Sequence, residues 1–356
     1  MVKIIHCADI HIGSVLQNLS SDKAKIRKRE IIDTFLNLMN YANKNKVNVV
    51  IIAGDLFDKN TIAKSTKKEI LDTIANYTAI DFLYLTGNHD DKIKFDDEDL
   101  ELPPNLKLFN SKDDWIYFDY GDVCITGFDV HKSKGTGFYE KLKLDKNKFN
   151  IATMHGDLKT IQLDRLKGKY IDYLALGDIH IPCTEPKKLD IRGLYGYCGC
   201  LEGRGNDESG ERGFFLIEIS QGKMKREFIK IAKRKHEIVE IDITGLDNHT
   251  KIASAMSIAT QSIKKENIVR VILKGKYNAD TQKDKENLTR KLQETFFCGN
   301  IKDLSKLDMS SVDYENEISL RREFVELVKQ SNLPDDEKDK IIEYGIKALQ
   351  GEVIEI

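Results

Sequence analysis

Apolar and polar positions follow a pattern that predicts short buried strands separated by amphipathic helices. The clearest strand covers residues 47–53, a β-branched apolar run that is followed directly by Gly54 and Asp55. Short apolar runs of this kind are typical of buried strands, and a glycine lets the backbone turn tightly where the strand ends. Apolar residues recur at helical spacing in residues 23–42 and 65–77, which we expect to be helices that cover the sheet. The pattern predicts an α/β protein.

Four further predicted strands, residues 2–7, 82–86, 149–154 and 171–176, also end in polar residues. Ligands of open α/β sheets bind at the carboxyl ends of strands. The residues found there are Asp9 and His11, Asn88, His89 and Asp90, His155, and Asp178 and His180. Each taken alone is an ordinary turn or surface residue. Because the pattern occurs at five strand ends, we expect these ends to converge on one metal-binding site.

Spacing suggests what some of these side chains do. Asp9 and His11 are two residues apart, so both side chains can face the same side of an extended segment, and Asp178 and His180 repeat this arrangement. A carboxylate oxygen and an imidazole nitrogen then point at one place.

The segment after residues 82–86 offers three different groups. Asn88 has an amide oxygen that can bind a metal, and His89 can donate a proton. Asp90 has a carboxylate that we expect to orient His89. The structural alternative for this segment is a simple turn.

The candidate ligands combine oxygen and nitrogen atoms without a thiolate. Such a set favours manganese, iron, magnesium or zinc over softer ions. Seven ligands, Asp9, His11, Asp55, Asn88, His155, Asp178 and His180, exceed what one ion of four to six ligands can accept. Two ions that share Asp55 are the simplest interpretation. Paired ions about 3.5 to 4 Å apart activate a water and hold the departing oxygen of a phosphate ester. The set therefore predicts phosphoester hydrolysis.

Composition constrains the function little. Lys and Arg number 56 against 58 Asp and Glu, so overall charge neither favours nor excludes nucleic acid. The six cysteines are scattered, which is typical of reduced thiols in a cytosolic protein. Cys198 and Cys200 supply only half of a structural zinc site, so we interpret them as packing or turn residues. No apolar run approaches the roughly 18 residues of a membrane span. We expect a soluble cytoplasmic protein that does not interact with a membrane.

The pattern changes near residue 236. Strands at 237–243 and 267–273 alternate with helices at 248–264 and 280–296, and none of the strand ends carries a candidate ligand. This region is expected to be a separate small α/β module. After residue 314 the chain is helical, charged and striped with apolar residues, so it either packs on its own protein or receives a partner helix.

Basic residues accumulate in a predicted hairpin of residues 213–219 and 224–231 and in the segment after it. They are Lys223, Lys225, Arg226, Lys230, Lys233, Arg234 and Lys235. A basic stripe suits a polyanion, but lysines are also common on exposed sheet edges. We slightly favour the polyanion.

Five motifs in order give the chain a resemblance to the calcineurin-like metallophosphoesterases over its first 235 residues. They are Asp9-Ile10-His11, Gly54-Asp55-Leu56-Phe57-Asp58, Gly87-Asn88-His89-Asp90, His155-Gly156 and Gly177-Asp178-Ile179-His180. Residues 8–13, 53–58, 176–182 and 199–214 also resemble DNA double-strand-break nucleases of the SbcD and Mre-eleven type.

This resemblance implies a fold and partners. The fold is an α/β, two-sheet metallophosphoesterase sandwich with helices on the outer faces, formed by residues 1–235. A small α/β capping domain that helps to bind DNA would cover residues 236–312. Residues 313–356 would form a helical tail that binds an SMC-like ATPase of the SbcC type. The resemblance also implies a homodimer.

The resemblance further implies a role for each site residue. The first metal ion would bind Asp9, His11, Asp55 and His180, and the second would bind Asp55, Asn88, His155 and the residue at position 178. His89 would be the general acid or would stabilise the scissile phosphate. This chain has Asp178 where the family usually has histidine.

We therefore expect a manganese-dependent, two-metal DNA exonuclease and endonuclease that acts in DNA repair. The alternative enzyme is a phosphodiesterase or phosphatase that acts on a small nucleotide, which would not need a cap and a tail. A scaffold protein with a decayed metal site is the third interpretation, and the retained candidate ligands argue against it.

Overall fold

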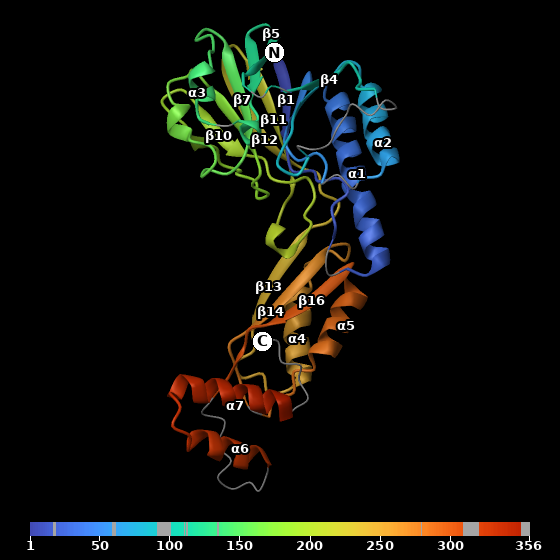
Figure 1. Cartoon of the computed structure of the whole chain (residues 1–356). Coiled ribbons are helices and arrows are strands. Elements are labelled where there is room, and N and C mark those ends of the chain that lie inside the picture. The colour runs from blue at the N-terminus through green and yellow to red at the C-terminus, as the bar shows by residue number, and fades with distance from the viewer. Residues whose placement is uncertain are drawn as a thin grey trace. The chain divides into compact units, whose positions relative to one another are not determined.

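The computed structural model describes residues 1–16, 19–58, 62–90, 101–109, 111, 113–133, 135–278, 280–308 and 320–349. The chain forms two compact units, Met1–Lys235 and His236–Ile356, and Figure 1 labels many of their elements. The acidic stretch 96–99, to which the sequence gives no function, lies outside the described residues. Among the described helices, none combines the length and the apolar character that crossing a bilayer requires.

The first sheet of the first unit has the strand order β12-β11-β1-β2-β3-β4. Strands β1 to β4 are parallel neighbours, whereas β11 is antiparallel to β1 and β12 is antiparallel to β11. The strands are β1 (Val2–Cys7), β2 (Val49–Ala53), β3 (Asp81–Leu85), β4 (Leu106–Leu108), β11 (Gly213–Ser220) and β12 (Lys223–Lys230). The carboxyl ends of β1, β2 and β3 therefore lie at one edge of this sheet.

The second sheet has the order β5-β6-β7-β8-β10-β9. Strands β6, β7, β8 and β10 are parallel neighbours, and β5 and β9 are antiparallel strands at the two edges. The strands are β5 (Ile116–Tyr120), β6 (Val123–Gly127), β7 (Phe149–His155), β8 (Tyr173–Gly177), β9 (Lys187–Lys188) and β10 (Leu194–Tyr197). The ends of β7 and β8 also lie together.

A shared core holds the two sheets face to face. Ile51 and Leu83 of the first sheet and Ile151 and Tyr173 of the second belong to one buried cluster. All five residues of β2 are buried, which explains why this strand is apolar throughout rather than alternating.

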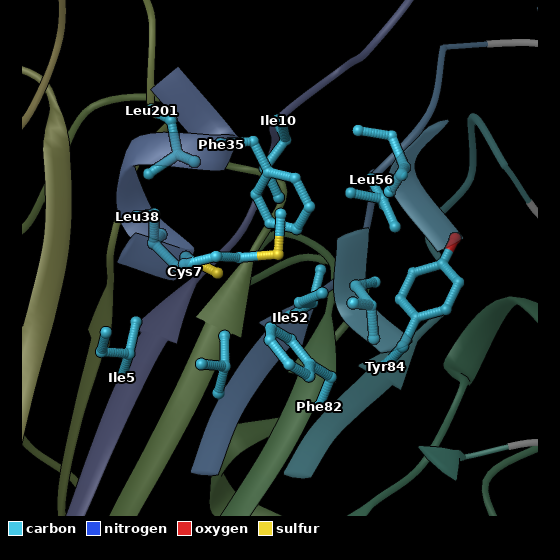
Figure 2. Close-up of a cluster of buried hydrophobic side chains, with 14 of the residues drawn as sticks. Ile5, Cys7, Ile10, Phe35, Leu38, Ile52, Leu56, Phe82, Tyr84 and Leu201 are labelled. Carbon is cyan, nitrogen blue, oxygen red and sulfur yellow. The ribbon is translucent and has the colours of Figure 1, made fainter. Parts of the chain in front are cut away.

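Helices α1 (Ser21–Lys44) and α2 (Lys64–Ala75) cover the other face of the first sheet. Figure 2 shows Phe35 and Leu38 of α1 against Ile5, Ile52 and Phe82 of the strands, all of them buried. Burying a side chain of this size contributes about 1.5 to 3 kcal/mol. This layer therefore fixes the strands whose ends carry the candidate ligands.

Short elements cover the outer face of the second sheet. Trp115, Phe128 and Phe138 pack there with Ile161 and Leu174. Besides α1 and α2, the described elements of this unit that lie outside the two sheets are α3 (Phe138–Lys141), η1 (Val130–Lys132), η2 (Leu163–Arg165) and η3 (Asn206–Glu208).

The second unit contains a parallel sheet of order β13-β14-β16. It comprises β13 (His236–Asp242), β14 (Ile268–Lys274), β16 (Cys298–Asp303), the pair β15 (Lys276–Tyr277) and β17 (Lys306–Leu307), and helices α4 (His249–Thr260), α5 (Lys285–Thr295), α6 (Leu320–Lys329) and α7 (Asp335–Leu349). Helices α4 and α5 are shorter than the sequence predicts, and the sequence pattern predicts no strand at the position of β16.

The two tail helices pack on each other and on their own unit. Val325 of α6 and Ile342 and Ile346 of α7 are buried in the same cluster as residues of β13, β14 and β16. Leu327 and Leu349 remain 70% and 40% exposed. The predicted α/β sandwich with outer helices, small α/β module and helical tail is confirmed, whereas a domain boundary at residue 313 stays a prediction.

Candidate metal centre

The candidate ligands lie where the strands of both sheets end. The Asp9 main-chain N–H donates to the Gly54 carbonyl at 3.1 Å, and the His11 N–H donates to the Asp55 carbonyl at 2.9 Å. The main-chain N–H of Asp178, which follows β8 in the other sheet, donates to the two Asp9 carboxylate oxygens at 3.0 and 3.2 Å. These bonds join the edges of the two sheets at one site.

Four of the candidate residues have strained backbone conformations. Asp9, His11 and Asp55 have φ of 52°, 51° and 52°, and Asp178 has φ of 97°. Residues with a Cβ rarely adopt positive φ, which costs on the order of 1 to 3 kcal/mol each, and such residues cluster at functional sites. The loops thus give up backbone stability to direct these side chains into the site.

Two glycines of the motifs are required by close approach. A Cβ on Gly54, whose φ is +98°, would lie 1.9 Å from Nδ1 of His155, and a Cβ on Gly87 would lie 2.1 Å from Oδ1 of Asp55. Any larger residue at either position would displace a candidate ligand.

One group of donors consists of Asp9, His11 and His180, whose ligand atoms lie within 4.8 Å of one another. The Nε2 atoms of His11 and His180 are 3.3 Å apart. Nδ1 of His180 donates to Oε1 of Glu208 at 2.6 Å, which leaves the lone pair of its Nε2 facing His11. Carboxylate-bound imidazoles of this kind are typical of metal ligands.

A second group consists of Asp9, Asp55 and His155. Nδ1 of His155 donates to the Ala53 carbonyl at 2.9 Å, and its Nε2 faces Oδ1 of Asn88 at 3.1 Å. The ring is therefore oriented with Nε2 toward the carboxylates. Asn88 adds a neutral oxygen to this group.

Asp55 belongs to the second group and also faces the first. Its Oδ2 is 3.5 Å from Nε2 of His11 and 3.4 Å from Nε2 of His155. Its Oδ1 accepts the main-chain N–H of His89 at 3.0 Å. A single carboxylate oxygen thus has the position that a ligand shared by two ions requires.

The electrostatics of the site also fit a cation. Burial raises the pKa of Asp9 to about 6. Burial alone would lower the pKa of His155, but its hydrogen bond to Asp55 and the charges of Asp9 and Asp55 raise it to about 10. Burial opposes ionisation of Asp55, yet the same bond to His155 lowers the Asp55 pKa to about 2. Without a metal, a proton on His155 supplies positive charge to the two carboxylates. A divalent ion would supply this charge instead, so the residues present fit divalent ions.

His89 lies beside this centre, but the prediction that Asp90 orients its ring is wrong. Nδ1 of His89 bonds to Oδ1 of Asp58 at 2.7 Å. The buried carboxylate of Asp90 instead accepts the hydroxyl of Tyr84 and the main-chain N–H groups of Gly87 and Phe57. Asp90 therefore shapes the loop, and Asp58 orients His89.

Asp178 belongs to neither group of donors. Its Oδ1 is 3.9 Å from Nε2 of His155, and its side chain is 30% exposed. Its main chain supports Asp9, as described above. A contribution of the Asp178 carboxylate to the second ion stays a prediction.

Sequence reasoning gave no role to three residues of the site. Asp58 stands in the Gly54 motif, three residues after Asp55, and this spacing was a usable signal. Glu208 and Arg204 lie in a loop far from His180 in the sequence, and Nη2 of Arg204 is 3.0 Å from Oε1 of Glu208. Only the folded chain shows that these two residues surround His180.

Two arginines of the basic stripe in and after the hairpin 213–231 make contacts within the protein. Arg226 stacks on the ring of Phe215 at 3.9 Å and donates to the carbonyls of Cys183 and Thr184, and Arg234 pairs with Glu30 at 2.7 Å. These two residues have structural roles, which weakens the case for a polyanion surface there.

Comparisons with known proteins agree with this geometry. The protein named "DNA double-strand break repair protein Mre11" of Sulfurisphaera tokodaii is 27% identical over 296 residues, which cover 77% of this chain and 74% of that protein. The protein of the same name in Saccharolobus solfataricus is 36% identical over 272 residues, 69% of this chain and 68% of that protein. A protein of Staphylococcus saprophyticus that is named as part of the nuclease SbcCD is 24% identical over 284 residues, 67% of this chain and 72% of that protein.

The family comparison covers the part of the chain that carries the candidate ligands. Residues 2–182 match the family described as "Calcineurin-like phosphoesterase". This range extends from β1 to the loop after β8 and includes all five motifs from Asp9-Ile10-His11 to Gly177-Asp178-Ile179-His180. The chain belongs to the calcineurin-like phosphoesterases, hydrolases of phosphoesters.

Proposed function

We propose that this protein is a manganese-dependent, two-metal DNA exonuclease and endonuclease that hydrolyses phosphodiester bonds in DNA repair. The observation that carries the chemistry is the position of Asp55 Oδ2 between Nε2 of His11 and Nε2 of His155. The choice of DNA is supported by relatives that are named for double-strand break repair or as part of a nuclease.

The ligands divide between two ions. Asp9, His11, Asp55 and His180 would hold the first ion. The second would be held by Asp55, Asn88 and His155, with the carboxylate of Asp178 as its further ligand. When bound, such a pair activates a water and stabilises charge on the phosphoryl oxygens. Carboxylate, amide and imidazole ligands suit manganese.

His89 is proposed to serve the phosphate rather than an ion. Asp58 fixes Nδ1 of His89 at 2.7 Å, and the two rings of His89 and His11 meet edge to face with centroids 4.9 Å apart. This arrangement directs the other ring nitrogen away from Asp58. A donor held there can protonate the leaving oxygen or bind a phosphoryl oxygen.

The proposal extends to partners. Helices α6 and α7 bury one face in their own unit and leave Leu320, Leu327 and Tyr344 at least 44% exposed. We propose that this exposed face binds an SMC-like ATPase of the SbcC type, that residues 236–312 help to hold DNA, and that the protein acts as a homodimer in the cytoplasm.

The function can be tested with the purified protein and three substrates. Linear double-stranded DNA, single-stranded DNA and a small cyclic or dinucleotide phosphodiester are incubated with manganese, magnesium or chelator. Asp55→Asn is the inactive control. We expect manganese-dependent shortening of linear DNA. Rapid turnover of the small phosphodiester without DNA cleavage would instead establish a small-nucleotide enzyme, and no hydrolysis of any substrate by protein that contains metal would contradict both.

A further inference from the structure

Arg204 places a permanent positive charge directly against a candidate metal ligand. Its Nη2 lies 3.0 Å from Nδ1 and 3.4 Å from Nε2 of His180, and 3.0 Å from Oε1 of Glu208. Nδ1 of His180 already donates its proton to Glu208. Because Nδ1 carries that proton it cannot accept from Arg204, so the 3.0 Å approach to Nδ1 is a contact, and Glu208 is the acceptor of the guanidinium.

The guanidinium is not needed to hold Glu208. Oε2 of Glu208 accepts the main-chain N–H of Arg204 at 2.6 Å, and Oε1 accepts from His180 at 2.6 Å. Both carboxylate oxygens would keep a strong donor if the Arg204 side chain ended at Cβ. A purely supporting role for Glu208 thus leaves the charge of Arg204 unexplained.

The main chain that carries Arg204 is firmly anchored to α1. Oε2 and Oε1 of Glu202 accept from Nη2 of Arg27 at 2.9 Å and from the hydroxyl of Thr34 at 2.8 Å. Arg27 also donates to the Gly203 carbonyl at 2.8 Å. Arg27 and Glu202 are 1% and 2% exposed, so buried bonds fix the two residues that precede Arg204.

Part of the guanidinium has hydrogen-bonding capacity to spare. Nε of Arg204 is buried and has no hydrogen-bond partner among the described residues, while the side chain as a whole is 17% exposed. An unpaired buried donor on a charged group is costly, and an anion that accepts from it removes that cost. Arginine stays protonated, and Glu208 at 3.0 Å balances its charge beside His180. The negative charge of a phosphate would stabilise the guanidinium further.

We propose that Arg204 is a further catalytic residue that binds a non-bridging oxygen of the phosphate during hydrolysis. The guanidinium presents several donors in one plane, a geometry that matches phosphoryl oxygens. His89 and Arg204 approach the same ion subsite, because His89 packs on His11 and Arg204 contacts His180. The inference rests on phosphoester hydrolysis and holds for either DNA or a small phosphodiester.

The test measures binding of inorganic phosphate to manganese-loaded protein by calorimetry, together with manganese binding to the metal-free protein. We expect Arg204→Ala to weaken phosphate binding about 10- to 100-fold, the usual range for a hydrogen bond between charged groups, while manganese binds as tightly as before or more tightly. Arg204→Lys keeps the charge and should recover part of the phosphate affinity. Arg165→Ala is the matched control, because Arg165 pairs with Glu140 on the surface and should change neither quantity.

Two results would overturn the assignment. Unchanged phosphate affinity in Arg204→Ala would show that Arg204 does not bind the phosphate. Loss of manganese binding together with phosphate binding would show that Arg204 only holds His180 in position. If the alanine variant does not fold, Arg204→Gln replaces it, with the same loss of phosphate affinity expected and retained affinity contradicting the proposal. If the protein does not cleave DNA, the phosphate and manganese measurements still test Arg204. The proposal for Arg204 and the proposal of a DNA nuclease can therefore fail separately.

Discussion

Replacing Asp58 by asparagine tests whether this residue, rather than Asp90, orients the proton donor. The bond from His89 Nδ1 to Asp58 Oδ1 is 2.7 Å long, and the Asp58 side chain is only 12% exposed. A hydrogen bond to a charged group in such a position contributes about 1.5 to 3 kcal/mol, or about 10- to 150-fold in rate if it is made fully only in the transition state. We expect Asp58→Asn to lower kcat by about this factor.

Combining the substitutions at Asp58 and His89 in one variant gives a sharper test of the orienting role. His89→Ala should lower kcat by about 100- to 10,000-fold, the contribution of a general acid, and should leave metal content unchanged. The double variant Asp58→Asn with His89→Ala should be no slower than His89→Ala alone, because Asp58 acts through His89. Asp90→Asn is the comparison variant and should mainly lower the unfolding midpoint.

Phosphodiester hydrolysis at saturating manganese, elemental analysis and thermal unfolding provide the three readouts. Fully additive effects of the two substitutions would refute the orienting role of Asp58. Asp58 also lies within 4.8 Å of ligand atoms of His11 and His89. Loss of metal in Asp58→Asn would therefore make Asp58 a ligand and refute the reasoning in a different way.

Three other predictions address the rest of the molecule. Asp178→Ala should weaken the second manganese more than the first, and titration isotherms identical to the parent's would remove Asp178 from the ligand set. Manganese must displace the proton of His155, whose pKa is about 10, so affinity measured by calorimetry should rise about tenfold per pH unit between pH 6 and 9. Below pH 6 it should fall more steeply, because Asp9, whose pKa is about 6, also becomes protonated; affinity independent of pH would contradict both assignments. Leu327→Asp, at an exposed position, should leave the unfolding midpoint unchanged and weaken binding of an SMC-like ATPase in a pull-down. Ile346→Ala, at a fully buried position, should lower the free energy of unfolding by about 2 to 5 kcal/mol, as measured by chemical denaturation. Equal stability losses would show that the helices do not pack as described.

The strand ends were predictable because they depend on local pattern. A β-branched run followed by Gly54 and Asp55 identifies a buried strand and the turn after it within a few residues of sequence. The parallel order of β1, β2 and β3 then brings Asp9, Asp55 and Asn88 to one edge by topology alone. No detail of side-chain geometry was needed for that step.

The partners of the histidines were not predictable in the same way. Asp90 is adjacent to His89 in sequence, yet the turn directs its carboxylate to the Gly87 N–H, while Asp58 arrives from a different loop. Turn dihedrals and contacts between distant loops decide these pairings, and neither leaves a periodic signal. The partly buried tail shows the same limit, because spacing gives an apolar stripe on a helix but does not tell what covers it.

The proposed chemistry depends above all on Asp55 being shared by two metal ions. Isothermal titration calorimetry of manganese into the metal-free protein measures this directly. Asn88→Ala, which removes a ligand of the second ion alone, is the comparison variant. A shared Asp55 predicts two manganese ions per chain in the parent, loss of tight binding at both sites in Asp55→Asn, and one retained tight site in Asn88→Ala. A single ion per chain in the parent, or a tight site that survives in Asp55→Asn, would contradict it.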